Sequence, residues 1–404
     1  MPPPHRNTAK PFCERALQED NLSPFATLRF WMHDTTRYCL GHLRPYMMQW
    51  NKDVLLIHDH KNSKRNYTTT KDAFTQFLRQ QLDELETFIT NEVLFGISLE
   101  SIGVSCRLTD SMDTGDRTTP GYGPFLAADD TTLDNVDSNK FLRALLKLGE
   151  ESPVCKVGGS LVWDKRKSDK WSMVCHMALQ SAYCLVHTTP GLAGRASEEV
   201  LIQWTNEEFG ACGNIRICHG TVAIDTSYHK GTLFTGMNKD ILRLLPYRLA
   251  RILHILLRVV RPVELMPILK FWVPVGTENA SVAVKLYRTR VFVSWGKLWT
   301  AAQMSTILKA WFKKGLDIPM GIRMYRHFAT CLQRRYIRYI KHDHPEDIQA
   351  AADAQAGRTV QTSEANYAIE RKAHNASKRI RDFELVSAYW HEMCGLETYP
   401  PSDD

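Results

Sequence analysis

Residues 215–224 read IRICHGTVAI, two short runs of apolar and β-branched residues on either side of a His-Gly pair. Such runs around a turn dipeptide predict a β-hairpin, with His219 and Gly220 in the turn. Residues 241–245, ILRLL, predict a third strand. The chain before and after this section shows helical periodicity. The sequence therefore predicts a mainly α fold with a small antiparallel β-sheet, which is an α+β class.

Helical spacing is clearest between Phe74 and Ile89, where apolar residues recur every three or four positions. The acidic residues of this segment fall on the opposite face, as in a helix that packs on one side. Residues 141–146 and 177–183 also read as helices, and most of 246–395 is helical by the same criterion.

The length of 404 residues suits two or three domains. Residues 108–138 are rich in Thr, Asp, Gly and Pro and predict a linker or a long loop. The expected order is a flexible lead (1–20), a helical N-terminal domain (21–107), that linker (108–138), a second domain (139–396) and a tail (397–404).

Charge is divided unevenly along the chain. The net charge of +7 combines −4 over residues 1–140 with +11 over residues 141–404. Residues 241–341 alone hold 19 basic and three acidic residues. This concentration is typical of a surface that binds a polyanion, and nucleic acid is the first polyanion to consider.

Several classes of protein are excluded or made improbable. The apolar content of 44% argues against a disordered chain. The sequence contains no P-loop, HExxH, GxGxxG or GxSxG motif, so neither an ATPase motor nor a zinc protease is expected. Its ten cysteines form no CxxC pair, and we expect reduced thiols and no metal site. The first residues lack the apolar region of a secretory signal.

The apolar stretch 241–275 could be taken for a membrane span. It is interrupted by five arginines, each of which costs about 2.5–3.5 kcal/mol at a bilayer centre. They are Arg243, Arg248, Arg251, Arg258 and Arg261. We therefore expect buried helices with a basic face, and no membrane partner.

Four motifs follow one another in the second domain: GRASE (194–198), YHKG (228–231), RMYRH (323–327) and the stretch 357–367. Their polar residues are Arg195 with Glu198, His229 with Lys230, Arg323 with Arg326 and His327, and Arg358 with Tyr367 nine positions later. Each motif alone is common. The order of the four, with suitable gaps, is a more specific signal.

This order resembles the catalytic domain of the tyrosine recombinases, the DNA breaking-rejoining fold shared with integrases and type IB topoisomerases. That family carries Arg, Lys, His-x-x-Arg, His or Trp, and Tyr in sequence. The same stretches look like the recombinase-like region of fungal proteins linked to telomeric RecQ-type helicases and of mobile elements. The resemblance covers roughly residues 140–395, and it implies double-stranded DNA as the partner and a nuclear location.

The resemblance also implies a role for each residue. Arg195 and Arg326 would bind the phosphate oxygens, since guanidinium groups stay protonated and bind phosphate bidentately. Tyr367 would be the nucleophile, and Lys230 would protonate the leaving 5′-oxygen. Apart from the resemblance, Glu198 lies three residues after Arg195, on the same face of a helical turn, and is expected to orient that Arg. No metal or ATP is needed for such a cycle.

Two positions depart from the family pattern. Arg323 stands where the family has His, and Arg358 stands at the second His or Trp position. Arginine cannot act as a base at neutral pH, so His327 or His229 would have to compensate. The gap between Arg326 and Tyr367 is also longer than usual. Two readings remain open: an active strand-transfer enzyme and a catalytically inactive DNA-binding remnant. A protein-interaction scaffold is a more distant third.

Further contacts are expected C-terminal to Arg326. Basic side chains interleaved with tyrosines predict contacts to the DNA backbone. They are Arg334, Arg335, Arg338 and Lys341. Residues 368–396 predict an amphipathic helix. By analogy with the family, this helix would dock on a second subunit when DNA is bound; packing onto its own domain is the alternative.

Overall fold

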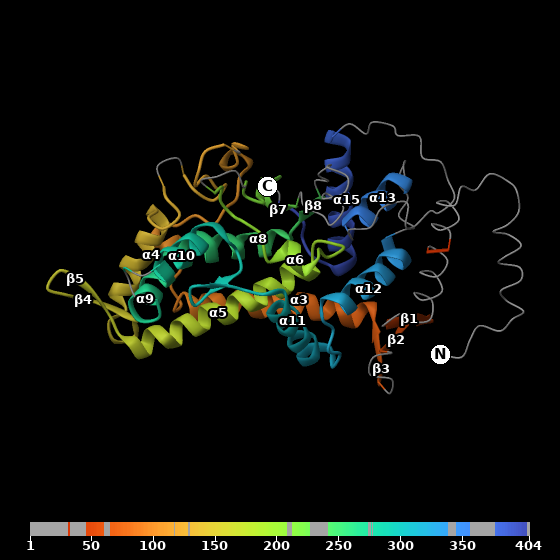
Figure 1. Cartoon of the computed structure of the whole chain (residues 1–404), viewed down its shortest axis with the longest axis horizontal. Coiled ribbons are helices and arrows are strands. Elements are labelled where there is room, and N and C mark those ends of the chain that lie inside the picture. Colours follow the sequence, from red (N-terminus) through yellow and green to blue (C-terminus); the bar gives the residue numbers. More distant parts are fainter. Residues whose placement is uncertain are drawn as a thin grey trace, which may run out of the picture. The chain divides into compact units, whose positions relative to one another are not determined.

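The structure is a computed structural model and divides into two compact units, Met1–Thr68 and Thr69–Asp404. Figure 1 follows the chain from its N-terminus to its C-terminus by colour. The described residues are 31–32, 46–59, 65–116, 118–127, 130–207, 212–226, 241–273, 276, 278–337, 345–355 and 376–401.

A three-stranded sheet lies mainly in the first unit, in the order β1 (Tyr46–Asn51), β2 (Val54–Asp59) and β3 (Arg65–Thr70), and the last two residues of β3 belong to the second unit. Leu55 and Ile57 are both fully buried, and a spacing of two is the period of a strand. The expectation of a mostly helical domain over 21–107 is therefore wrong for residues 46–59 and 65–70. Short apolar runs such as VLLIHD permit either structure, and pairing with a neighbouring strand determines which one forms.

The second unit consists mainly of helices. Its α-helices are α3 (Lys71–Phe88), α4 (Val136–Lys147), α5 (Lys165–Thr188), α6 (Ala196–Glu199), α8 (Tyr247–His254), α9 (Arg261–Phe271), α10 (Glu278–Thr289), α11 (Ala301–Leu316), α12 (Ile322–Leu332), α13 (Pro345–Gln355) and α15 (Ala376–Cys394). Short 3₁₀ or π segments are η2 (Ile89–Val93), η3 (Glu100–Ile102), η4 (Asp110–Met112), η5 (Gly149–Glu151), η6 (Ile255–Val260) and η7 (Gln333–Ile337).

Among the described residues of this unit, the strands form three small sheets. They are β4 (Val154–Val157) with β5 (Ser160–Trp163), β6 (Ile215–Cys218) with β7 (Thr221–Thr226) and β8 (Ile241–Leu244), and β9 (Val293–Ser294) with β10 (Lys297–Leu298). All of their pairings are antiparallel. Helices with small antiparallel sheets confirm the α+β class.

The predicted hairpin is β6–β7, and the predicted third strand is β8. Cys218 lies opposite Thr221, so His219 and Gly220 form a two-residue turn. Both have positive φ, 53° and 71°, as a type I′ turn requires. Strand β8 pairs with β7 from Ala223–Leu244 to Thr226–Ile241. The local sequence was sufficient to predict this hairpin because the turn residues and the flanking strand residues favour the same structure.

The long helix α5 lies in the core of the second unit and contacts α3, α8, α9 and α11 (Figure 1). Asp164 caps its start by accepting a hydrogen bond from Lys167 N at 2.8 Å. Trp171 and Tyr183 are buried along it. The indole of Trp171 donates to Val93 O at 2.9 Å, which fixes the segment after α3. Helix α3 thus belongs to this unit and not to a separate N-terminal domain.

The described residues between Leu108 and Asn135 form a long loop attached to the second unit, α4 begins at Val136, and the chain does not divide there. Asp113 accepts a hydrogen bond from Ile217 N at 3.0 Å, and Asn206 donates to Thr119 O at 3.0 Å. A Cβ on Gly123 would lie 2.7 Å from Trp204 O. Glycine at position 123 thus lets the loop pack closely against the backbone of Trp204. The composition of the segment alone suits a flexible linker equally well.

The C-terminal helix α15 packs against its own unit. Phe383, Val386 and Trp390 are almost fully buried, and the helix contacts β8 and α13. The indole of Trp390 donates to Thr188 O at 3.1 Å, at the end of α5. The apolar face is therefore covered by the chain's own core, which is the alternative to docking on a second subunit. None of the helices among the described residues is long and apolar enough to cross a membrane.

Candidate functional site

Two segments that are far apart in the sequence, one with Arg195 and the other with Arg323 and Arg326, line one cavity of about 420 Å³ in the second unit, which we call the arginine pocket. It is lined by Arg195, Ala196, Ala301, Ser305, Ile322, Arg323, Arg326 and His327. None of these described lining residues is acidic. Arg195, Arg326 and His327 are half-buried, whereas Arg323 is exposed. The cavity is therefore open to solvent and positively charged.

Two helix starts add to this positive field. Ala301 and Ile322 are the first residues of α11 and α12, whose N-terminal ends carry partial positive charge. Gly321 precedes α12, and a Cβ there would lie 2.7 Å from Ser305 Oγ. Glycine thus lets the start of α12 approach α11 closely enough to form the pocket wall.

Helix α12 is held in place by the face opposite its arginines. The hydroxyl of Tyr325 donates to Thr188 O at 2.8 Å, and its ring stacks on Phe312 at 5.5 Å between centroids. Phe328 meets Phe74 edge-on at 4.9 Å. Because Tyr325 and Phe328 are fully buried, the helix cannot rotate without opening the core. Arg323 and Arg326 are consequently held at the pocket.

Arg195 is positioned by Glu198, as the spacing of three predicted. The Glu198 carboxylate accepts a hydrogen bond from Arg195 N at 3.0 Å and lies 3.5 Å from the Arg195 guanidinium. Glu198 is buried, so this contact fixes the start of α6. The same carboxylate therefore orders the backbone and the side chain of Arg195.

A buried polar layer beneath α6 was missed at the sequence level. His187 is fully buried, and its Nδ1 lies 2.7 Å from Glu199 Oε2. Arg243 is buried nearby in β8, and the charges of Glu198 and Glu199 act on it. The one sequence feature that indicated this buried polar layer was Arg243, a charged residue within the otherwise apolar run ILRLL.

Several of the predicted site residues lie outside the described residues. They are His229, Lys230, Arg338, Lys341, Arg358 and Tyr367. Of the predicted DNA contacts, Arg334 is exposed, and the Arg335 guanidinium lies over the ring of Tyr336 at 5.6 Å. Both belong to η7 and do not line the arginine pocket.

Much of the positive charge in residues 241–341 is internal, which corrects the expectation of a basic helix face. Arg243, Arg258 and Arg261 are at most 8% exposed. Arg248 is bound to Asp83 and Glu86 of α3 at 2.6 and 2.5 Å. These four arginines serve the fold. The charge count alone thus overstates the surface available to a polyanion.

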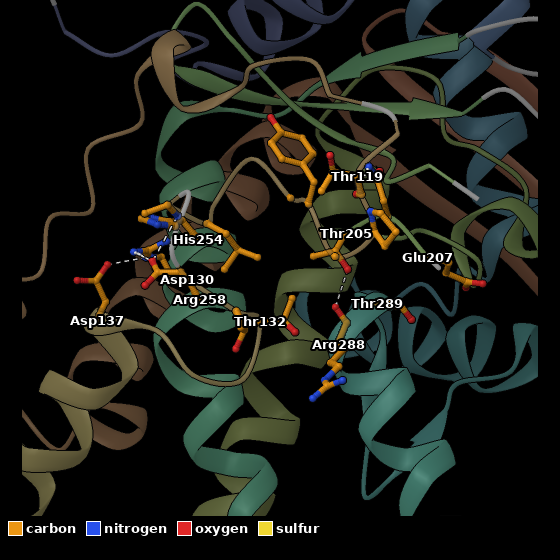
Figure 2. Close-up of a pocket in the computed structure, with 18 of the residues that line it drawn as sticks. Thr119, Asp130, Thr132, Asp137, Thr205, Glu207, His254, Arg258, Arg288 and Thr289 are labelled. Carbon is orange, nitrogen blue, oxygen red and sulfur yellow. Dashed lines mark hydrogen bonds and ion pairs between the residues drawn. The ribbon is translucent and has the colours of Figure 1, made fainter. Parts of the chain in front are cut away.

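A second cavity in the same unit is larger, about 1610 Å³, and lies between the 105–132 loop and α10. Figure 2 shows Asp130 and Arg258 beside His254, with Thr205 and Arg288 across the cavity from them. His254 is 1% exposed, and burial together with the Arg258 charge lowers its pKa to about 4. The imidazole is therefore neutral at pH 7 and adds no positive charge to this cavity.

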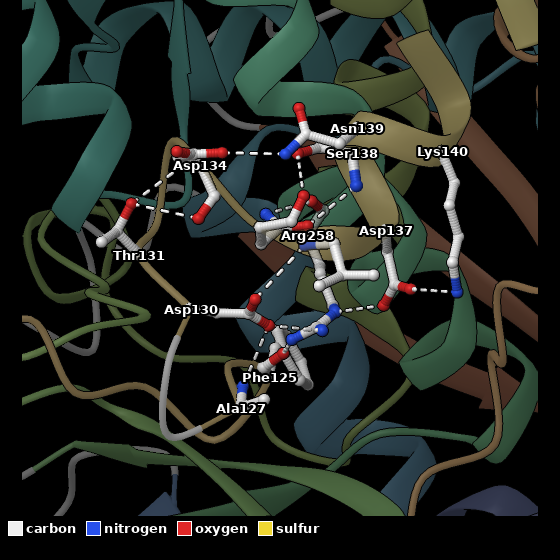
Figure 3. A network of polar contacts seen from close by, with 12 residues as sticks. Phe125, Ala127, Asp130, Thr131, Asp134, Asp137, Ser138, Asn139, Lys140 and Arg258 are labelled. Carbon is white, nitrogen blue, oxygen red and sulfur yellow. Dashed lines mark hydrogen bonds and ion pairs between the residues drawn. The ribbon is translucent and has the colours of Figure 1, made fainter. Parts of the chain in front are cut away.

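Arg258 holds the wall of this second cavity together (Figure 3). Its guanidinium binds Asp130 at 2.7 Å and Asp137 at 2.5 Å, and it also donates to Phe125 O. The side chain of Asn135 donates to Arg258 O at 3.0 Å. Asn135 is also the N-cap of α4, so this bond ties the start of α4 to η6.

The chemistry of the two cavities differs. The larger one contains paired charges and hydroxyl groups, whereas three arginines and a histidine line the arginine pocket, with Glu198 3.5 Å from the Arg195 guanidinium. The described residues place no three His, Cys, Asp or Glu side chains where they could share a metal ion. Of the two, the arginine pocket is suited to a phosphate group.

No protein-family model, curated protein or solved structure matches this chain.

Proposed function

We propose that this chain binds double-stranded DNA at the arginine pocket and breaks and rejoins a strand through a phosphotyrosine link at Tyr367. The observation that carries the proposal is that Arg195, Arg323 and Arg326 line one cavity. The motif order led us to expect Arg195 and Arg326 at one site, and their convergence requires the fold of the whole second unit.

The pocket residues have separate tasks in this reaction. Arg195 and Arg326 bind the two non-bridging oxygens and stabilise the charge that builds up at phosphorus. Arg323 adds a third cation at the exposed side of the pocket. His327 lies beside Arg326 in the lining and is the group that can accept the phenol proton, which arginine cannot do.

The bond changes follow from these roles. The Tyr367 oxygen forms a bond to phosphorus as its proton leaves, and the bond from phosphorus to the 5′-oxygen breaks. Lys230 donates a proton to that oxygen, so a free 5′-hydroxyl results. Its attack on the phosphotyrosine reverses the step and restores the strand. The phosphotyrosine retains the energy of the phosphodiester.

A covalent-adduct assay tests the proposal. The full chain is incubated with nicked suicide-substrate DNA, and we expect a protein–DNA adduct that Tyr367→Phe abolishes. Arg326→Ala should also abolish it, whereas Arg143→Ala, an exposed arginine on α4, should leave it unchanged. Absence of an adduct from the native chain would refute strand cleavage.

DNA binding without cleavage is the second candidate, favoured by the arginines at the two histidine positions. In that case the native chain binds DNA with a salt-dependent constant, and Arg326→Ala reduces both the affinity and the salt slope relative to Arg143→Ala. Binding that does not depend on salt would exclude both functions.

A further inference from the structure

Arg243 connects three separate segments of the second unit through one side chain. It is the third residue of β8 and is 4% exposed. Its Nε donates to Leu192 O at 3.1 Å, one terminal nitrogen donates to Thr226 Oγ1 at 2.9 Å, and the other donates to Gln355 O at 2.5 Å. The planar guanidinium suits this role because its donors point in different, fixed directions.

Each of the three acceptors lies a few residues before a residue of the proposed active site in the sequence. Leu192 lies three residues before Arg195. Thr226 is the last residue of β7, four residues before Lys230. Gln355 is the last residue of α13, three residues before Arg358 and twelve before Tyr367. Each acceptor therefore marks the point from which the chain continues to a residue of the proposed active site.

A second layer of contacts strengthens the same junction. The Gln355 amide donates to Leu242 O at 2.9 Å, and Ser387 of α15 donates to Pro190 O at 2.9 Å. Gly191 has a φ of 106°, and a Cβ there would lie 2.9 Å from Gln355 Oε1. The loop before Arg195 is thus packed directly against the end of α13.

The buried charge of Arg243 is balanced by the carboxylates that order Arg195. Burial lowers the pKa of the guanidinium, while Glu198 and Glu199 raise it, and arginine remains protonated at neutral pH. Leaving a guanidinium in the interior without such partners is strongly destabilising. Glu198 also accepts from Arg195 N, so the charge balance reaches the arginine pocket.

We infer that Arg243 is a positioning residue for the DNA-cleaving site: it ties the loop that leads to Arg195 to the ends of β7 and α13. This inference rests on the proposed function. Arg243 contributes no group to the reaction. Its effect is on geometry, and a displacement of about 1 Å in a reacting group can lower a rate about 100-fold.

The test compares Arg243→Met with Arg261→Met in the full chain. Arg261 is a matched control because it is also a buried arginine that donates to backbone carbonyls, those of Arg290 and Val291, but away from the three segments. Hydrogen exchange, DNA affinity and the rate of adduct formation are measured for both variants under conditions where both are folded.

We expect Arg243→Met to raise amide exchange around Leu192, Thr226 and Gln355 together. It should slow adduct formation about 100-fold while DNA affinity changes less than about threefold. Arg243→Lys should lie between the two, since one ammonium cannot reach all three acceptors with the guanidinium's geometry. Arg261→Met should leave exchange in these segments and the adduct rate near native values.

A milder variant keeps the inference falsifiable if Arg243→Met does not fold. Thr226→Val removes one acceptor with little change in volume, and it should slow adduct formation several-fold. Equal slowing by Arg261→Met, or native rates in both Arg243→Lys and Thr226→Val, would overturn the inference. If the native chain forms no adduct, the proposed function fails, and the exchange pattern still decides whether Arg243 holds the three segments together.

Discussion

Replacing Arg258 by Met would leave two carboxylates in the interior without their cation. The side chains of Arg258, Asp130 and Asp137 are 9%, 5% and 13% exposed, and the ion pairs are 2.7 and 2.5 Å long. Removing one partner of a buried pair costs about 3–5 kcal/mol, because the remaining charge is poorly solvated. The bond to Phe125 O is lost as well. We expect the free energy of unfolding to fall by about 4 kcal/mol.

Urea denaturation of the full chain measures this loss. With an m-value of about 3 kcal/mol/M, the midpoint should fall by roughly 1.3 M. Arg143→Met, at an exposed position on α4, should change the stability by less than about 0.5 kcal/mol. These two variants separate the loss of a buried charge pair from the loss of an arginine as such.

A triple variant tests the physical reason. Adding Asp130→Asn and Asp137→Asn to Arg258→Met removes the uncompensated charges, so we expect at least half of the lost stability, about 2 kcal/mol, to return. A loss below about 1 kcal/mol in Arg258→Met would refute the reasoning. So would an equal loss with and without the two carboxylates.

Three further predictions concern two buried titratable groups and one glycine in close contact with a neighbouring helix. Burial raises the pKa of Glu264 to about 7, so the folded chain holds a proton that the unfolded chain releases above pH 4.5. Its contribution to stability therefore falls as the pH rises from 4.5 to 7, on the order of 3 kcal/mol, and urea midpoints of Glu264→Gln at pH 5 and 7 should differ less than those of the native chain. The pKa of His254 is about 4 in the folded chain and 6.5 in the unfolded chain, so this residue destabilises the fold as the pH falls from 6.5 to 4, and His254→Phe should reduce that loss in the same measurement. Gly315→Ala would place a Cβ 1.9 Å from the ring of Phe77, and thermal unfolding should show a net loss above about 1 kcal/mol although alanine favours the helix by about 1 kcal/mol. A more stable Gly315→Ala variant would contradict the close packing of α11 on α3.

The β6–β7 hairpin was predictable because its determinants are local. His219 and Gly220 adopt the positive φ of the turn, and apolar runs flank them. The strands of residues 46–70 were not predictable in the same way. Leu55 and Ile57 are buried at a spacing of two, but the surrounding run is short enough to suit a helix as well. Here a pairing partner, and not the local pattern, selects the structure.

The candidate site was likewise predictable from the sequence only in part. The motif order singled out Arg195, Arg323 and Arg326, and the pocket contains all three. The role of Arg243 had no comparable signal, since its acceptors come from three distant segments. Backbone carbonyls are present at every position, so no sequence pattern can show which of them an arginine will reach.

The amino-acid sequence by itself determined the α+β class, the β6–β7–β8 section and the number of positive charges between residues 241 and 341. Only the tertiary structure decided which of these charges face a ligand. Arg243, Arg258 and Arg261 are enclosed because carbonyls and carboxylates from remote segments satisfy their donors. Arg323 and Arg326 remain at a cavity because the opposite face of α12 is buried in the core. A guanidinium is stable in either setting when its donors are bound or hydrated, so its place is set by the partners that folding brings to it.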